Sequence, residues 1–421
     1  MAQTAFPFAL TTPALQAAAR SQRVGGDGAP ALPAEADATG FRIGWDHARH
    51  QLTPPLAHLH AASPVRQGWS AGRTAFGART LKAGPQVRQW LALRLAAWQR
   101  GEAVEEVQVT PHFLAQLHGP QGGTCPVTRQ PLPAAGQPAD EAVVQRLNPA
   151  AAHAGGNLVL LHRSAAEARD ALPCTELLAL AQRLAEGEAG ATLRGLDARA
   201  WQRLAVLASF ATPLPHSQAA TLPLVVLPPN RVRVINPVQA LQVMLTLQFT
   251  QGGYARRLLT LAALMPSSEA RQAFQIFMHT LLARRLAAGQ GLDPAATRQA
   301  MEDSWLDPLV QRRWQRLALW LTAADCERLL QRASQRGLCV GGGRWLPSNA
   351  AVDGWAMAEP MAAVAGSAAG DAGPVGVNGA ADAADAAGSG AAGPVGRQAG
   401  MVARRALPSI ARSRGSQKLA S

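Results

Sequence analysis

Apolar residues recur at helical spacing along much of the chain, most regularly after residue 236. There the pattern predicts helices only, over about 236–248, 254–265, 267–282, 293–304, 307–321 and 323–337. In the fifth of these, Val310, Trp314 and Leu317 fall on one stripe. Because the connections between the segments are short, we expect the helices to pack antiparallel in a bundle.

The first half of the chain has a more mixed pattern. Val87, Trp90, Leu91 and Trp98 predict an amphipathic helix from about 85 to 100. Shorter helices are expected at about 111–118, 175–186 and 198–210, the last with Asp197 as its N-cap. Residues 41–83 are rich in Gly, Pro, His and Arg, which is typical of loops. Two β-prone runs, 222–227 and 231–235, flank Pro228-Pro229-Asn230 and predict a hairpin.

The two ends of the chain differ in composition from its middle. Residues 1–40 lack sustained periodicity, and 356–396 consist almost wholly of Ala, Gly, Asp, Pro and Val, so both are predicted to be disordered. The expected organisation is a disordered segment (1–40), a mixed region (41–215), a mainly helical bundle (216–355), and a flexible linker with a basic tail (356–421).

Composition narrows the class of protein. No run of about 18 apolar residues occurs, and the first residues lack the basic start of a signal peptide, so we expect no membrane partner. The four cysteines are scattered and form no CxxC pair, which favours reduced thiols in a cytoplasmic protein.

Positive charge is concentrated in the middle of the chain. The net charge is +13, and residues 41–355 alone carry +12. Such a field favours polyanions, nucleic acid above all, as partners. The alternative is compositional, because nearly all of the charge is Arg in a chain rich in Ala, Gly and Pro, and GC-rich coding produces that bias without selection for binding.

The stretch from 125 to 169 contains the most informative motif. It holds Cys125-Pro126-Val127-Thr128, then Gln145-Arg146-Leu147-Asn148-Pro149, then Gly155-Gly156-Asn157-Leu158, then His162 and Arg169. In order and spacing it resembles the HNH family of ββα-metal endonucleases. The resemblance implies a β-hairpin packed on a helix, and it covers roughly 45 of the 421 residues.

The residues that would perform the family's chemistry are missing. The Asp-His pair, which supplies a metal ligand and the general base, falls on Gln145-Arg146, and the last metal ligand falls on Ala166. Of the cysteines that hold a structural zinc in many members, only Cys125 is present, and His162 stands at the position of a second. We therefore expect no bound metal and no HNH-type cleavage.

The same residues also suit a scaffold without metal. In that interpretation Gly155-Gly156 forms a tight turn and Asn157 caps a helix that runs to about Leu172. Arg146, Arg163 and Arg169 would then face phosphates, or they form a solvated surface.

Two other clusters are candidate sites. Arg66, Arg73, Arg79, Lys82 and Arg88 alternate with Trp69, Phe76 and Trp90, which suits single-stranded nucleic acid or, equally, an aromatic core beneath a basic surface. His47, His50, His58 and His60 have spacings that suit a transition metal if the loop folds back, or they are packed and surface histidines.

The sequence thus predicts a mainly α protein with a small α+β module at about 111–172. No cofactor-binding motif occurs, so we expect no cofactor. Enzymatic activity is left open, but the substitutions favour a non-catalytic protein whose HNH-like module contacts nucleic acid. The alternatives are a helical protein-interaction protein and a metal-dependent nuclease.

Overall fold

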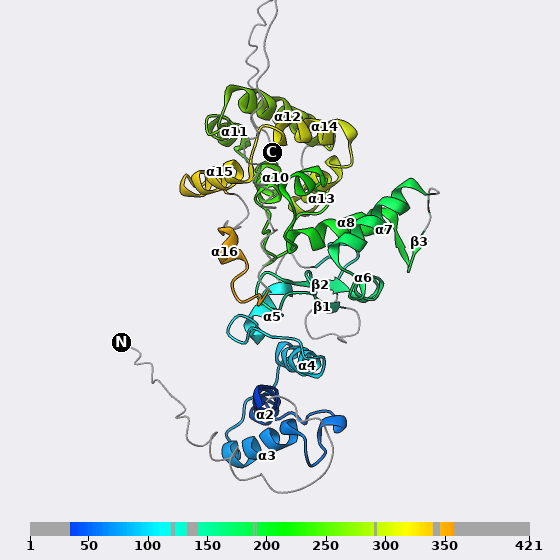
Figure 1. The fold of residues 1–421 in the computed structure, drawn as a ribbon, viewed down its shortest axis with the longest axis vertical. Coiled ribbons are helices and arrows are strands. Elements are labelled where there is room, and N and C mark those ends of the chain that lie inside the picture. The colour runs from blue at the N-terminus through cyan, green and yellow to red at the C-terminus, as the bar shows by residue number, and fades with distance from the viewer. Residues whose placement is uncertain are drawn as a thin grey trace, which may run out of the picture. The chain divides into compact units, whose positions relative to one another are not determined.

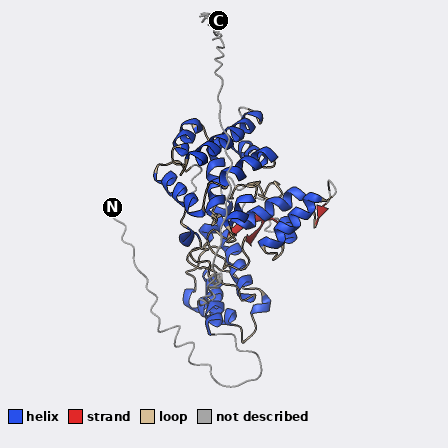
Figure 2. Cartoon of the chain, turned by 45° about the horizontal axis from the view of Figure 1, so that its top comes forward, coloured by secondary structure: helices blue, strands red, loops and turns tan. Residues whose placement is uncertain are grey.

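A computed structural model describes residues 34–118, 123–132, 142–187, 190, 192–289, 293–339 and 346–357. Contacts divide the chain into two units, 1–361 and 362–421, and the second lies wholly outside the described residues. The predicted disorder of 1–33 and 358–421, including the basic tail, therefore falls outside them too. The described part is mainly helical with a few short strands, as expected (Figures 1 and 2).

Helices occupy the region that was predicted to be loops. Helix α2 (Ala34–Arg49) begins inside the segment assigned to disorder, and α3 (Pro64–Phe76) follows a single 3-10 turn, η1 (Leu56–His58). Helix α4 (Pro85–Gln99) confirms the amphipathic prediction, and α5 is Pro111–His118. The loop prediction was wrong because the glycines of α2 and α3 serve helix contact.

Helices α2 and α3 touch through two pairs of glycines, Gly40 and Gly44 on α2 and Gly68 and Gly72 on α3, and the members of each pair are four residues apart. A Cβ on Gly44 would overlap the Val65 carbonyl oxygen and lie 2.8 Å from the Trp69 amide nitrogen. A Cβ on Gly68 would likewise overlap the Phe41 carbonyl oxygen. The two backbones therefore approach more closely than any side chain permits, which offsets the poor helix propensity of glycine.

A β-hairpin followed by a helix forms the α+β part. Strands β1 (Ala142–Arg146) and β2 (Leu158–His162) pair antiparallel, with Gln145 opposite Val159, and α6 (Arg163–Arg169) contacts both. The prediction that Asn157 caps a helix to Leu172 was wrong: 158–162 is strand, and His162 is the N-cap. The run after Asn157 is apolar at four successive positions, and all four are buried. Continuous burial of this kind suits a strand with both faces covered.

Each face of the hairpin lies against a different cluster. Val159 and Leu161 join the main core, which includes Ala165 and Ala166 of α6. Leu158, on the opposite face, packs with Leu114 and other side chains near α5. The hairpin is thus enclosed on both sides.

Helices α7 (Cys174–Glu186) and α8 (Ala198–Phe210) match their predictions, and the Asp197 side chain accepts a hydrogen bond from the Ala200 amide as the expected N-cap. Between them lie the two-residue strands β3 (Thr192–Leu193) and β4 (Leu196–Asp197).

The predicted hairpin at 222–235 is absent from the described residues. The short helix α9 (His216–Thr221) leads into a buried coil there instead. Its backbone groups find partners on distant side chains: the Glu302 carboxylate accepts from the Leu227 amide at 2.9 Å, and Gln242 donates to the Leu222 carbonyl at 2.9 Å. Side-chain partners of this kind take the place of a pairing strand.

The remaining helices form the predicted bundle, and an aromatic cluster lies at its centre. Phe277 lies 5.4 Å from Trp314 and 5.6 Å from Trp305 between ring centroids. The elements are α10 (Pro237–Leu247), η2 (Gln248–Thr250), α11 (Tyr254–Ala262), α12 (Ser268–Ala287), α13 (Pro294–Ser304), α14 (Pro308–Ala318) and α15 (Ala323–Gln335).

After the bundle, the chain returns to the hairpin. The segment 346–357, which contains α16 (Ser348–Ala351), inserts the fully buried Trp355, whose indole N–H donates to the Gly155 carbonyl at 3.0 Å. One buried apolar cluster consequently runs from Cys125 to Trp355, across the boundary that the sequence placed near 215. Within the described ranges, no helix is long and apolar enough to cross a membrane.

Candidate nucleic-acid interface

The HNH-like motif folds into a compact strand–strand–helix arrangement. Gln145 on β1 faces α6, and its amide nitrogen lies 3.4 Å from the Ala166 carbonyl oxygen. These two positions, 21 residues apart, are those at which the resembled family carries metal ligands. An amide and a methyl group stand there instead, so the acidic ligand is replaced by a neutral group and the last ligand is absent.

The loop 123–132 forms a tight turn beside the start of α6. Its ends pair at Thr124 and Pro131, and the Cys125 amide donates to the Gln130 carbonyl at 2.8 Å. The Cys125 sulfur accepts from the His162 amide at 3.3 Å, so two residues separated by 37 positions are in contact. In the resemblance to the HNH family described above, both fall at positions where many members carry zinc ligands.

Protein contacts hold this loop from two sides. The Arg203 side chain of α8 donates to the Val127 carbonyl at 2.7 Å. Arg129 forms ion pairs with Asp303 at 2.6 Å and with the buried Glu302 at 3.4 Å. Two arginines thus tie the loop to α8 and α13. Among the described residues, no group of three or more His, Cys, Asp and Glu could hold a metal ion.

Two asparagines close the connection between the strands. The Asn157 side chain accepts from the Asn148 amide at 2.8 Å and donates to the carbonyls of Asn148 and Ala152. Gly156 has φ +93°, and a Cβ there would collide with the Arg233 side chain. Asn157 is therefore a loop-closing residue, and Gly155-Gly156 forms the predicted tight turn.

Arg146 lies on the face of the hairpin opposite α6. Its guanidinium pairs with Glu102 at 2.5 Å and donates to the Ala151 carbonyl at 3.0 Å. Burial alone would raise the pKa of the Glu102 carboxyl, but Arg100 and Arg146 outweigh it and hold the pKa below its usual value. The positive charge of Arg146 is thus largely balanced by the Glu102 carboxylate inside the protein.

His153 completes this cluster. It is 5% exposed, and its Nε2 lies 3.8 Å from the Glu102 carboxylate. Burial, followed by the charge of Arg146, lowers the pKa of His153 to about 4. The imidazole is therefore neutral at physiological pH.

Arg169 is not positioned to face phosphates. It is 1% exposed and donates to the Leu147 carbonyl at 2.7 Å, and burial lowers its pKa to about 10. Arg163 is exposed and lies 3.6 Å from Glu167. The expectation that Arg146, Arg163 and Arg169 form one phosphate-facing set is thus corrected: one is buried, one is paired internally, and one is on the surface beside an acid.

The second set of arginines has the opposite character. Between His47 and Gly101 the chain contains eight basic residues and no Asp or Glu. One of the eight, Arg94, is buried and pairs with Asp46 and Glu106, both at 2.6 Å. Six others are exposed and take part in no ion pair within the described residues: Arg49, Arg66, Arg73, Arg79, Lys82 and Arg88.

The aromatic residues among these bases are committed to packing. The Trp69 indole donates to the Leu52 carbonyl at 3.0 Å, and the Arg73 guanidinium lies over its ring at 4.9 Å. The Trp90 indole donates to the Val109 carbonyl at 2.8 Å, and Phe76 packs edge-on against a neighbouring tryptophan. The surface therefore presents cations for phosphates and few free rings for base stacking.

The four histidines whose spacing would suit a transition metal form no group that could hold a metal ion in the described part of the chain. His47 is buried and its Nδ1 lies 2.8 Å from the Ile43 carbonyl oxygen, while the buried His58 bonds the Gln99 amide at 2.8 Å. His60 is exposed. Burial lowers the pKa of His47 and of His50. The packed-histidine alternative describes this arrangement.

Comparison with known protein families, with curated proteins and with solved structures finds no match for this chain. Sequence reasoning missed the roles of Glu102 and Trp355 at the hairpin. No local signal marks them, because their partners lie 44 and 200 residues away in the chain.

Proposed function

We propose that this is a non-catalytic nucleic-acid-binding protein of the cytoplasm. In this proposal the exposed bases around α3 and α4 contact the phosphate backbone, and the HNH-like unit serves as a scaffold. Four free cysteines accord with a reducing compartment.

The degenerate HNH relationship is supported by three features of the fold. The hairpin and helix occur in the family's order, the Gln145 and Ala166 positions are neighbours, and Cys125 touches His162. A nuclease role is disfavoured because Gln145, Arg146 and Ala166 stand in place of the acidic metal ligand, the general base and the last metal ligand.

The absence of any carboxylate from 47–101 is the observation that carries the binding proposal. Surface cations in proteins are usually interspersed with acids, whereas the stretch from 47 to 101 holds six exposed bases with no acid among them, and none of the six has an ion-pair partner in the described structure. Such a surface attracts polyanions and releases counterions when phosphates replace them. Since the aromatic rings are packed, binding should depend little on sequence.

Fluorescence anisotropy with the full chain tests this proposal. Labelled duplex DNA, single-stranded DNA and RNA are titrated at about 50 and 200 mM salt, and affinity should fall steeply between the two. Arg66→Gln, Arg79→Gln and Arg88→Gln are combined, because these three side chains are exposed and form no ion pair within the described residues. Each lost phosphate contact should flatten the slope of log K against log salt by about 0.9.

The matched control carries the same charge change on the bundle. Arg316, Arg332 and Arg336 are exposed on or beside α14 and α15, and their replacement by Gln should leave the salt slope nearly unchanged. If the protein binds none of the three nucleic acids at low salt, or if both triple variants lose affinity equally, the proposed interface is wrong. The helical-interaction alternative would then take precedence.

A further inference from the structure

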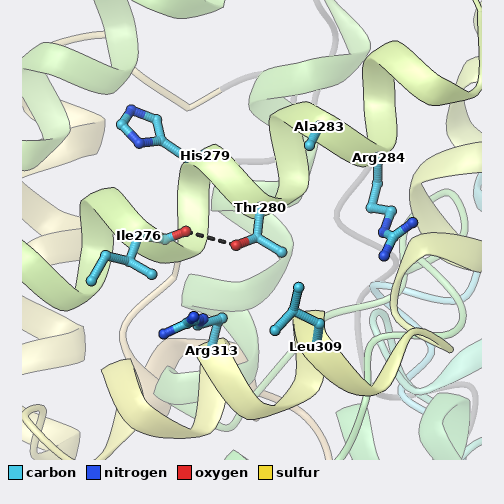
Figure 3. A pocket seen from close by; sticks show the side chains of 7 residues that line it. All are labelled: Ile276, His279, Thr280, Ala283, Arg284, Leu309 and Arg313. Carbon is cyan, nitrogen blue, oxygen red and sulfur yellow. Dashed lines mark hydrogen bonds between the residues drawn. The ribbon is translucent and has the colours of Figure 1, made fainter.

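Helices α12 and α14 leave a hollow of about 510 Å³ on their outer side. Ile276 and Thr280 of α12 lie opposite Leu309 and Arg313 of α14, and Arg284 stands at one end (Figure 3). The Thr280 hydroxyl donates to the Ile276 carbonyl at 2.8 Å, so it turns its methyl group toward the hollow. We call this hollow the α12–α14 groove.

The walls of the α12–α14 groove are held in place from below. Phe277 of α12 packs against Trp305 and Trp314, and Trp314 lies on α14 itself. All three rings are fully or almost fully buried. A rigid aromatic layer thus fixes the spacing of the two helices, and a ligand would meet a preformed surface.

The two helices carry an excess of positive charge, and two of their arginines, Arg284 and Arg313, line the groove. Helices α12 and α14 together contain six arginines and a single carboxylate, Glu269. Arg284 pairs with Asp307, whereas Arg313 has no ion-pair partner in the described part of the chain. The exposed His279 adds a further group that can become cationic.

We propose that the α12–α14 groove binds an acidic amphipathic helix of a partner protein. Ile276, Thr280 and Ala283 stand at i, i+4 and i+7 on α12, so they form one edge of a helix-packing surface. A partner helix with apolar residues at the same spacing would bury them and Leu309, which is 37% exposed. Acidic residues beside that ridge would meet Arg313 and its basic surroundings.

Other occupants fit less well. Nucleic acid would place phosphate and sugar against the apolar side chains that line the groove, Ile276, Ala283 and Leu309. The chain's own acidic stretch, 356–396, contains no Leu, Ile, Phe, Tyr or Trp and so cannot supply an apolar ridge. An acidic amphipathic helix of a partner matches both the apolar lining and the arginines of the groove.

The test uses the full chain and a labelled synthetic helix of about 18 residues, with Leu along one face and Glu on its flanks. Anisotropy should detect saturable binding. Leu309→Ser and Arg313→Gln should each weaken it, by roughly three- to tenfold. The matched controls are Leu319→Ser and Arg312→Gln, exposed neighbours that do not line the groove, and these should change affinity by less than about twofold.

Three competitor probes decide between occupants. A peptide with Ser in place of the Leu ridge, and one with Lys in place of Glu, should both fail to compete. Equal loss in the groove and control variants, or no binding of the acidic helix, would overturn the proposal. Displacement by duplex DNA, or by a peptide of residues 356–396, would also overturn it and assign the groove to that occupant. The outcome is independent of the basic surface around α3, which these variants do not touch.

Discussion

Replacing Gly68 by Ala tests the closest approach in the structure. An added Cβ would overlap the Phe41 carbonyl oxygen of α2 and lie 2.7 Å from its carbonyl carbon. Both atoms belong to the backbone of the facing helix and cannot rotate away. The methyl group fits only if α2 and α3 move apart.

Two opposing effects set the magnitude. Ala stabilises a helix interior relative to Gly by about 0.8–1.0 kcal/mol. Overpacking typically costs about 1–3 kcal/mol and more where backbone must shift. At Gly68 the obstructing atoms are backbone, so the cost should lie at or above the top of that range, about 3–4 kcal/mol, and the net loss in the stability of the α2–α3 pair should be about 2–3 kcal/mol.

Hydrogen exchange followed by mass spectrometry measures this locally. Amides of α2 and α3 should exchange roughly 30- to 150-fold faster in Gly68→Ala, the ratio that corresponds to this loss. Gly72→Ala should have a smaller effect, because its Cβ would lie 2.8 Å from the Ala48 methyl group and 3.2 Å from the Trp45 carbonyl oxygen, without the direct overlap found at Gly68. Gly252→Ala is the control, since no heavy atom lies within 4 Å of its added Cβ.

Slower hydrogen exchange in the variant, in place of faster exchange, would refute the contact between Gly68 and α2. If Gly68→Ala slows exchange in α3, the substitution behaves as in an isolated helix, and α2 does not lie against Gly68. Since Arg66 and Arg73 lie on the same helix, loosening of α3 should also weaken any nucleic-acid binding.

Other predictions concern the hairpin. Arg169→Ala should lower the free energy of unfolding by about 2–4 kcal/mol, because it leaves a cavity and an unpaired buried carbonyl. Arg163→Ala, at an exposed position, should change it by less than about 0.5 kcal/mol. Chemical denaturation of the two variants measures both values. The pKa of His153 is about 4 in the folded protein and 6.5 without burial, so the unfolded chain binds an extra proton between these values. Stability should therefore fall as pH drops from about 6.5 to about 4, and less so in His153→Asn, when unfolding is measured at pH 7 and pH 5. Thr128→Cys with Ala165→Cys should restore a four-ligand site that gives Co²⁺ its visible tetrahedral absorption, and a chain that stays colourless would count against the HNH relationship.

The sequence predicted the bundle well because its signals are local. Apolar stripes set the helix spans, and polar caps mark their starts: Ser267 accepts from the Ala270 amide, and Asp307 accepts from the Leu309 amide. Neither signal depends on a distant partner. Fold class and helix order after 236 could therefore be predicted from periodicity alone.

Helices α2 and α3 could not be predicted in that way. Their closest contacts are made by backbone beside Gly44 and Gly68, positions that carry no side chain from which a stripe could be read. A Gly-x-x-x-Gly repeat in each segment, 40–44 and 68–72, was the available signal. Glycine's low helix propensity pointed instead to loops.

The arginines of the hairpin were misplaced for a related reason. Arg146 and Arg169 owe their burial to Glu102 and to the Leu147 carbonyl, which no spacing rule connects to them. Positive charge in a sequence indicates attraction to anions, but it does not show whether the partner is a group of the same protein or an external polyanion. The structure assigns the internal partners, and it leaves six of the eight bases of 47–101 exposed and without an ion-pair partner in the described part of the chain.

The loop at Cys125 is a tight turn that protein contacts hold in place without a metal ion. A zinc ion cross-links two short segments through four ligands and so fixes their separation. Here the same segments touch through the Cys125 sulfur, while Arg129 and Arg203 tie the loop to α13 and α8. These ties end on helices that lie outside the HNH-like stretch, and Trp355 closes the hairpin from further still. A metal-held unit is self-contained, but one held by such contacts depends on the surrounding helices. The buried cluster that includes both Cys125 and Trp355 accords with these ties between the hairpin and the helices that follow it.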